Sequence, residues 1–186
     1  DAADRLRADG WVVTETPCPP MRQPAEINAQ LWMAEMRYGA KEMIAKEAEA
    51  DSIFVFDQMT KRSPDVDMHG LLNALQTRAG LLREWSIFLQ EHPILLCPVS
   101  GQLPFLQQYD VSSEQNFETA IEAQLPQLAI PMLGLPSLAV FTGFSGKSPV
   151  GVQLTAGRYR EDILLAAGAS IERGGPSPSV MDPQFQ

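Results

Sequence analysis

The stretch GFSGKSPVGVQL, residues 143–154, contains the residue types of two catalytic motifs. Gly146, Lys147 and Ser148 match the end of a phosphate-binding loop, in which the lysine and the hydroxyl contact phosphate and its metal ion. A serine between glycines is also typical of a serine hydrolase. The third alternative is a tight turn between two strands, in which the glycines serve the backbone and the chemistry lies elsewhere.

The phosphate-loop interpretation fails on two counts. Such a loop needs a glycine five positions before the Gly-Lys pair, and that position holds Phe141. The loop should also open a helix. Here Ser148 is followed by Pro149 and then by branched apolar residues, which favour a strand.

The hydrolase interpretation fails on spacing as well. A nucleophile elbow needs a glycine two positions after the serine, and two positions after Ser145 stands Lys147. The pattern that remains is two strands joined by a glycine-rich turn. We therefore predict a β-hairpin with strands at 137–141 and 150–154 and with Lys147 exposed at its tip.

Composition limits the kind of protein that carries this hairpin. With 186 residues, of which 45% are hydrophobic and 20% charged, the chain has the size and composition of one globular domain. Its net charge of −9 repels nucleic-acid phosphates. No apolar run approaches the ~20 residues that span a bilayer. We therefore expect neither a nucleic-acid partner nor a membrane.

The thiols and imidazoles are too few and too scattered to form a metal site. Cys18 and Cys97 lie far apart in the sequence, and His69 and His92 lack carboxylates or thiols at ligand spacing. We expect no metal and no cofactor. Cysteines used in this way fit a reducing compartment, so a cytoplasmic location is expected.

Apolar periodicity indicates the elements that must position the hairpin. Residues 1–10 read as the end of a helix with a glycine cap, and a strand is predicted at 11–15. Long amphipathic helices are predicted at 25–50 and 68–91, and a strand covered on both sides at 94–97. Because its first residues already read as the end of a helix, the chain looks like part of something longer.

The second half begins with irregular segments. Residues 100–110 mix glycine, proline and aromatic residues and predict a loop lying over a pocket. The spacing of the Ser-Ser-Glu-Gln stretch at 112–115 is that of a capping box, so a short helix to Gln124 should follow. The Pro- and Ser-rich tail at 174–186 is expected to be loosely ordered.

The hairpin and the residues after it resemble the C-terminal segment of the amidase signature family. Members of that family read approximately G-L-P-A, strand, turn, P-V-G-V-Q-L and a closing helix. The matching residues are Gly134, Leu135, Pro136, Pro149, Val150, Gly151, Val152, Gln153 and Leu154. Glu161, Asp162, Leu164, Leu165 and Ala167 fit the closing helix. Segments 8–13 and 93–98 are similar to family strands, so the resemblance extends over residues 1–186.

This chain departs from the family at several positions. Pro131 stands where the family commonly has an asparagine, and Phe141 stands where it has a proline. Family members hydrolyse amides with a nucleophilic serine, a second serine in a cis peptide and a lysine. No stretch here resembles the segments that carry those residues. The adjacent serines Ser112 and Ser113 are followed by Glu-Gln rather than by the glycines of an oxyanion-binding loop.

The resemblance implies that the chain is one unit, the C-terminal part of the amidase signature fold, with a mixed β-sheet flanked by helices. The catalytic residues would lie outside this chain, in an N-terminal half, and the chain alone should be inactive. The whole protein would hydrolyse a small-molecule amide to a carboxylate and ammonia or an amine. The expected contribution of this chain to the substrate pocket is Pro104, Phe105, Leu106, Met132 and Leu133.

Two further expectations concern partners. A sheet cut from its N-terminal half leaves an edge and apolar helix faces uncovered. The isolated chain is therefore expected either to form a homo-oligomer or to be monomeric because its helices have repacked over this surface. The alternative to an amidase fragment is a non-catalytic α/β binding module that derives from an amidase. The sequence does not specify the amide substrate.

Overall fold

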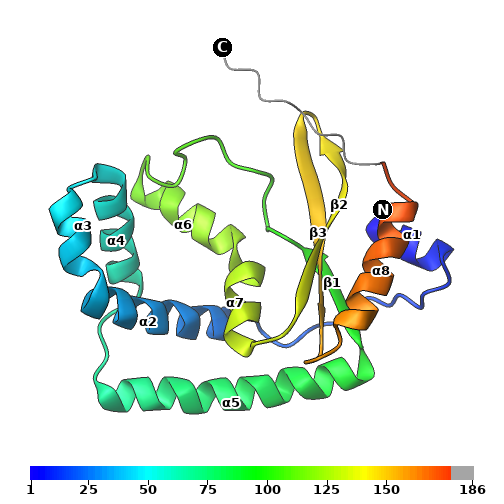
Figure 1. Ribbon diagram of the computed structural model, residues 1–186, viewed down its shortest axis with the longest axis horizontal. Helices are drawn as coiled ribbons and strands as arrows, with labels where there is room; N and C mark the ends of the chain where they lie inside the picture. The colour runs from blue at the N-terminus through cyan, green and yellow to red at the C-terminus, as the bar shows by residue number, and fades with distance from the viewer. Residues whose placement is uncertain (177–186) are drawn as a thin grey trace.

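The computed structural model of the chain describes residues 1–176, and in these residues helices cover both sides of a three-stranded sheet (Figure 1). Helices α1 and α8 lie on one side of the sheet, α2, α3, α4, α6 and α7 lie on the other, and α5 runs beneath both (Figure 1). The element bounds are α1 (Ala2–Ala8), α2 (Arg22–Gly39), α3 (Lys41–Glu47), α4 (Ala50–Arg62), α5 (Met68–Glu91), β1 (Ile94–Pro98), α6 (Glu114–Ala123), α7 (Leu125–Leu133), β2 (Ser137–Ser145), β3 (Ser148–Ala156) and α8 (Glu161–Arg173). The predicted α/β class is confirmed. Most of the tail predicted to be loose, 177–186, lies outside the described residues.

The sheet has the strand order β1-β3-β2, and both of its pairings are antiparallel. We predicted a mixed sheet. The difference has a simple cause for β2 and β3, because the two-residue turn that joins them permits only antiparallel pairing. β1 also runs antiparallel to β3, with Ile94 opposite Ala156 and Pro98 opposite Val152.

The predicted hairpin is confirmed, and its strands are longer than expected. The turn consists of Gly146 and Lys147, and Gly146 has a φ of 61°, which a glycine adopts without strain. The register shifts between Phe141 and Gly143, which marks a bulge in β2. Lys147 is exposed at the tip, as predicted.

Two apolar clusters form the core. The helix-side cluster joins α2, α5 and α7. Its buried members are Ile27, Ala74, Leu81, Trp85, Leu89, Ile130, Met132, Leu133 and Leu135. The sheet-side cluster lies between the sheet and the helices α1 and α8. Its buried members are Ala2, Leu6, Val140, Leu154, Ala156, Leu164, Ala167 and Ile171.

The N-terminal helix ends as the sequence predicts. Asp9 follows α1, and Gly10 comes next with a φ of 89°. The Gly10 N–H donates to the Arg7 carbonyl at 3.1 Å, and the Trp11 N–H donates to the Leu6 carbonyl at 3.0 Å. These two bonds are the pattern of a Schellman cap, which reverses the chain direction after the helix.

The strand predicted at 11–15 is not formed. Trp11 and Val13 contact the sheet-side cluster while Val12 is 93% exposed, so the alternation that suggested a strand is real. A strand also needs a hydrogen-bonded neighbour, and no strand within residues 1–176 pairs with this segment.

The single helix predicted at 25–50 is wrong, because three helices cover this part of the chain. α2 ends at Gly39, a residue that weakens helices, and α3 begins two residues later. Ala48 then adopts the left-handed conformation with a φ of 53°. The Glu49 carboxylate accepts hydrogen bonds from the backbone of Asp51 and Ser52 and starts α4.

The helix predicted at 68–91 is confirmed as α5. Its N-terminus is capped by Asp67, whose carboxylate accepts a hydrogen bond from the Gly70 N–H at 2.8 Å. Its apolar stripe faces the helix-side cluster through Leu81, Trp85 and Leu89. None of the helices described in residues 1–176 is both long and apolar enough to cross a bilayer.

Candidate functional site

An apolar groove of about 790 Å³ lies between α2, α4 and α6. This volume lies within the range of small-molecule binding sites. The apolar side chains that line the groove come from four helices and from the loop before α6. They are Ala25, Ala29, Trp32, Met33 and Met36 of α2, Val55, Phe56 and Met59 of α4, Val111 of the loop, Phe117, Ala120 and Ile121 of α6, and Leu125 and Leu128 of α7.

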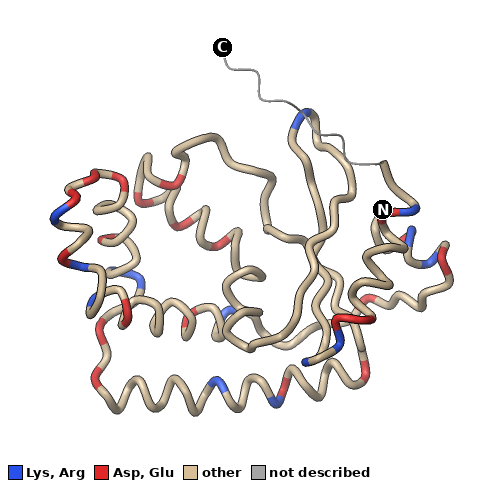
Figure 2. The backbone as a smooth tube through the Cα atoms, in the orientation of Figure 1, with Lys and Arg blue, Asp and Glu red and all other residues tan. Residues whose placement is uncertain are grey.

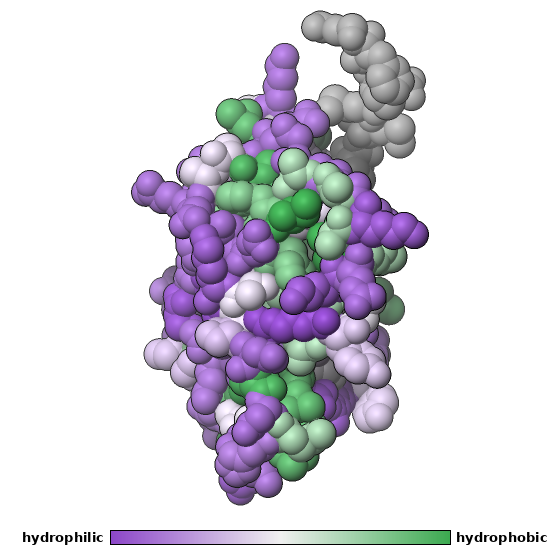
Figure 3. Space-filling model, turned by 90° about the vertical axis from the view of Figure 1, so that its left-hand side faces the viewer, coloured by the Kyte–Doolittle hydropathy of each residue, from purple (hydrophilic) through white to green (hydrophobic). Residues whose placement is uncertain are grey.

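Helical periodicity places these residues on one side of their helices. On α2 the lining residues include Ala25, Ala29, Trp32 and Met36, which recur at intervals of three and four. α4 packs on α6 beside the groove, where the Phe54 and Phe117 rings meet edge to face with centroids 6.3 Å apart. Figure 3 shows the face of the molecule that carries α3 and α4, where hydrophobic side chains gather in patches between hydrophilic ones.

Polar groups occur at the rim of the groove. The loop between β1 and α6 crosses to α4, where the Gln108 side-chain amide donates to the Asp51 carboxylate at 3.0 Å. Glu26, Asp110 and Gln124 also line the groove. An apolar cavity with a few polar groups at its rim suits a ligand that has an apolar body and a polar end.

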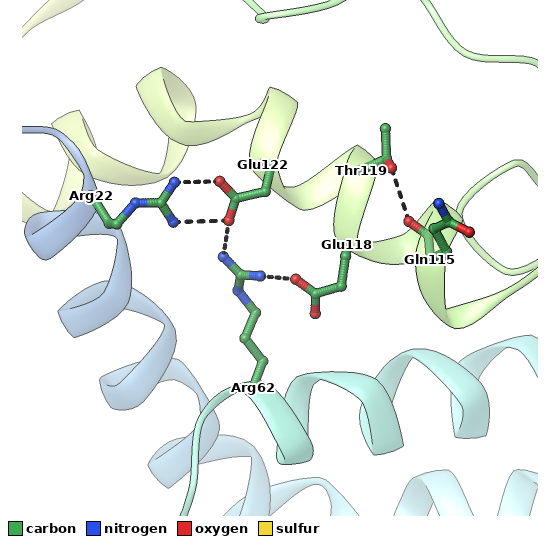
Figure 4. Close-up of polar contacts among 6 residues, drawn as sticks. All are labelled: Arg22, Arg62, Gln115, Glu118, Thr119 and Glu122. Atoms are coloured by element: carbon green, nitrogen blue, oxygen red, sulfur yellow. Dashed lines mark hydrogen bonds and ion pairs between the residues drawn. The ribbon is translucent and has the colours of Figure 1, made fainter.

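Arginines join the helices beside the groove (Figure 4). Arg22 of α2 forms a bidentate pair with Glu122 of α6, with N–O distances of 3.0 and 2.6 Å. Arg62 of α4 lines the groove and donates to Glu122 at 2.6 Å and also to Glu118. The hydrogen bonds from Arg22 and then from Arg62 lower the pKa of Glu122 to about 2. This carboxylate stays charged, so its role here is to hold α6 to α2 and α4 rather than to transfer protons.

The predicted pocket residues do not line this groove. Pro104 and Phe105 line a separate depression of about 600 Å³ beside the start of β3. Leu106 is 84% exposed, while Met132 and Leu133 are buried in the helix-side cluster. The structure therefore places Pro104 with Phe105 and Met132 with Leu133 in two separate regions and leaves Leu106 exposed. The part of these five residues in binding a substrate stays a prediction.

The residues that line the groove were not identified from the sequence. The signal is present, since the recurrence of apolar residues such as Met36 within 25–50 predicts a helix with one apolar face. Periodicity locates an apolar face. It does not distinguish a face that packs against other helices from one that borders a groove.

The adjacent serines Ser112 and Ser113 and the lysine Lys61 are engaged in structural hydrogen bonds and an ion pair. Ser113 caps α6, and Ser112 donates to the Tyr109 carbonyl at 2.6 Å. Lys61 pairs with Glu114. Among residues 1–176 the structure records no serine hydrogen-bonded to a lysine and no cluster of His, Cys, Asp and Glu suited to a metal ion.

The thiols are poor nucleophile candidates too. Burial first, and then the neighbouring Cys18, raise the pKa of Cys97 to about 11. Burial also raises the pKa of Cys18. Both thiols are protonated at neutral pH, and a protonated thiol is a weak nucleophile.

Comparison with known proteins identifies the family. Residues 1–165 match the family described as Amidase, and the chain belongs to that family. Indoleacetamide hydrolase from Bradyrhizobium japonicum is 29% identical over 92% of this chain and 37% of its own length. The protein of the same name from Bradyrhizobium diazoefficiens is 28% identical over 92% of this chain and 33% of its own length. The chain therefore spans little more than a third of the curated relatives it matches.

Solved structures show the same fold at low sequence identity. A fatty acid amide hydrolase superposes with a TM-score of 0.72 and 15% identity, over 92% of this chain and 35% of that protein. The complex of 6-aminohexanoate cyclic dimer hydrolase with its substrate superposes with a TM-score of 0.69 and 19% identity, over 95% of this chain and 40% of that protein. The described residues therefore match part of the amidase fold.

Proposed function

We propose that this chain is the C-terminal portion of an amide hydrolase, which converts a carboxylic amide to a carboxylate and ammonia or an amine. One observation carries the proposal. The chain belongs to the amidase family and contains an apolar groove, but it spans about a third of its relatives and the described residues lack a serine–lysine pair. The catalytic groups would then come from the N-terminal half of the same protein.

In the proposed mechanism that N-terminal half supplies a lysine, a serine in a cis peptide and the nucleophilic serine. The lysine removes the proton of the nucleophile through the second serine, an acyl-enzyme forms as ammonia or an amine leaves, and water hydrolyses it. A lysine acts as a base only when burial lowers its pKa. The present chain contributes apolar surface that excludes water. Pro104, Phe105, Leu106, Met132 and Leu133, which lie outside the groove between α2, α4 and α6, stay proposed residues of the substrate pocket.

The groove favours an amide substrate with an apolar, aromatic body. Its walls combine aromatic and methionine side chains, which adapt to flat apolar ligands. The name of the relatives from Bradyrhizobium states that they hydrolyse indoleacetamide, an aromatic amide. We propose that the whole protein acts on a small aromatic amide of this kind. We also propose that it works in the cytoplasm without a cofactor and without a nucleic-acid or membrane partner.

Ammonia release from indole-3-acetamide tests the proposal. The 186-residue chain alone should release none above a no-protein control, whereas the longer polypeptide that includes the preceding segment should release it. In the longer polypeptide Met36→Ala should raise KM about tenfold, because Met36 lines the groove. Tyr38→Ala is the matched control on the same helix, since Tyr38 is 98% exposed and does not line the groove.

Two results would contradict this function. The first is amide hydrolysis by the chain alone that a single serine substitution abolishes. The second is an equal KM for the Met36→Ala and Tyr38→Ala proteins. One feature supports the alternative of a non-catalytic binding module, namely an apolar groove in described residues that contain no serine–lysine pair. Ligand binding without turnover in the longer polypeptide would favour that alternative.

A further inference from the structure

Two arginine side chains converge at the C-terminal end of α7. Arg78 of α5 donates through Nε to the Met132 carbonyl at 2.6 Å. Arg158, in the loop between β3 and α8, donates through Nη2 to the Leu133 carbonyl at 3.4 Å. A Cβ atom on Gly134 would lie 3.3 Å from Arg158 Nη2 and 3.6 Å from Arg78 Nη2. The two guanidinium groups therefore meet beside the glycine that ends α7.

These two positive charges have no ion-pair partner among residues 1–176. In that part of the chain, every other arginine except Arg83 forms an ion pair with an acidic side chain. Acidic side chains are abundant, since the net charge of the chain is −9. The overall composition therefore does not explain why Arg78 and Arg158 lie together without a carboxylate.

The end of α7 offsets only part of this charge. The carbonyl groups at a helix C-terminus together carry roughly half of an elementary negative charge, whereas each of the two guanidinium groups carries a full positive charge. Each guanidinium also has one recorded hydrogen bond, to a carbonyl of α7. Most of their N–H donors thus remain available to an acceptor from outside the described chain.

A depression of about 450 Å³ opens beside the arginine pair. Its volume lies within the range of small-molecule binding sites. Gly134 has a φ of 64°, and a side chain at this position would be strained and would reach toward both guanidinium groups, so the glycine keeps this space open. The residues that line the depression are Gly134, Leu135, Pro136, Arg158, Tyr159 and Glu161.

We propose that Arg78 and Arg158 bind a small molecule that carries a carboxylate or a phosphate, in the depression at the end of α7. A guanidinium group can donate two parallel hydrogen bonds to either of these oxyanions. Leu135 and Pro136 offer apolar surface to the rest of the ligand. The proposal does not depend on amide hydrolysis, because this depression shares no lining residue with the groove between α2, α4 and α6.

NMR titration of the arginine Nε–H signals in the 186-residue chain tests the proposal. Sodium acetate and sodium phosphate are the two probes, and sodium chloride at the same ionic strength is the reference. The signals of Arg78 and Arg158 should shift and saturate with at least one probe, and the probe that saturates them identifies the oxyanion. Arg83 is the internal control, because it lies on α5, is exposed and forms no ion pair within residues 1–176.

Substitutions separate anion binding from capping of α7. Arg158→Gln should weaken binding at least about tenfold, because it removes charged hydrogen bonds to the ligand. Arg83→Gln, which removes the same charge from the surface, should leave binding unchanged. Glu161 lines the depression and repels an anion there, so Glu161→Gln should strengthen binding about threefold. An arginine pair that only caps α7 would show none of these changes.

Three results would overturn the proposal. The first is a shift that does not saturate with either probe or that Arg83 shares, because screening of surface charge would explain it. The second is equal binding by the Arg158→Gln and Arg83→Gln proteins. The third is saturation in the 186-residue chain but not in the longer polypeptide, which would assign the arginine pair to an acidic side chain of the remaining protein.

Discussion

The sheet side and the helical side of the molecule are held together by different forces. The strands β1, β2 and β3 contain no charged residue, and their inner face is buried against α1 and α8 in the sheet-side cluster. On the helical side, charged residues occur along α2, α3, α4 and α6 (Figure 2), and ion pairs join α2 and α4 to α6 beside an apolar groove. The first region is held by apolar burial and strand pairing, whereas the second leaves apolar surface open in the groove.

Truncation of one apolar side chain on each side should give the largest difference in stability between the two regions. Leu154 of β3 is fully buried in the sheet-side cluster, so Leu154→Ala should lower the free energy of unfolding by about 3 kcal/mol through lost burial and a cavity. Trp32 borders the groove and is 55% exposed, so Trp32→Ala should cost less than about 1 kcal/mol. Urea unfolding of both variants measures the difference. Equal losses would show that the groove is packed like the core.

A smaller effect is expected where two strands approach closely. A Cβ atom on Gly151 would lie 2.6 Å from the Val140 carbonyl oxygen, so Gly151→Ala should lower the free energy of unfolding by about 2 kcal/mol. Gly157, just after β3, has no atom within 4 Å of such a Cβ. Gly157→Ala should therefore change the free energy of unfolding by less than about 0.5 kcal/mol. Thermal unfolding of the two alanine variants compares them, and equal melting temperatures would contradict the tight β2–β3 contact.

The ion pairs of the helical side should give the smallest effect and a dependence on pH. Glu122→Gln should cost about 1 kcal/mol, because the carboxylate is 37% exposed and solvent screens its pairs with Arg22 and Arg62. Lys147→Ala, which removes an exposed charge at the hairpin tip, should change stability by less than about 0.5 kcal/mol.

The pH dependence follows from the lowered pKa of Glu122. Its ordinary pKa is 4.5 and its pKa in the folded chain is about 2, so the stabilisation is complete above pH 4.5 and is lost as the pH falls toward 2. Glu122→Gln should therefore make the loss of stability between pH 4.5 and 2 less steep. The midpoints of urea unfolding of the wild-type protein and the Glu122→Gln variant, measured between pH 4.5 and 2, test this pH dependence. Parallel acid curves for the wild-type protein and the Glu122→Gln variant would show that the network contributes nothing.

Elements defined by neighbouring residues were predictable from the sequence. The hairpin was predictable because strand alternation and a glycine-containing turn are adjacent in the chain. The helix α5 follows from the recurrence of Leu82, Trp85 and Leu89 at intervals of three and four, and Gly10 marked the end of α1. Each of these signals lies within a few residues of the structure that it specifies.

The tertiary structure decided what depends on distant partners. Residues 11–15 have the alternation of a strand, but pairing requires a neighbour that residues 1–176 do not supply. Periodicity in 25–50 predicted one helix, whereas α2 and α4 fold back on each other and enclose the groove with α6. A groove lies in the space between elements. Met36 and Phe117 border the same groove only because packing brings their helices together, and no local sequence pattern encodes that packing.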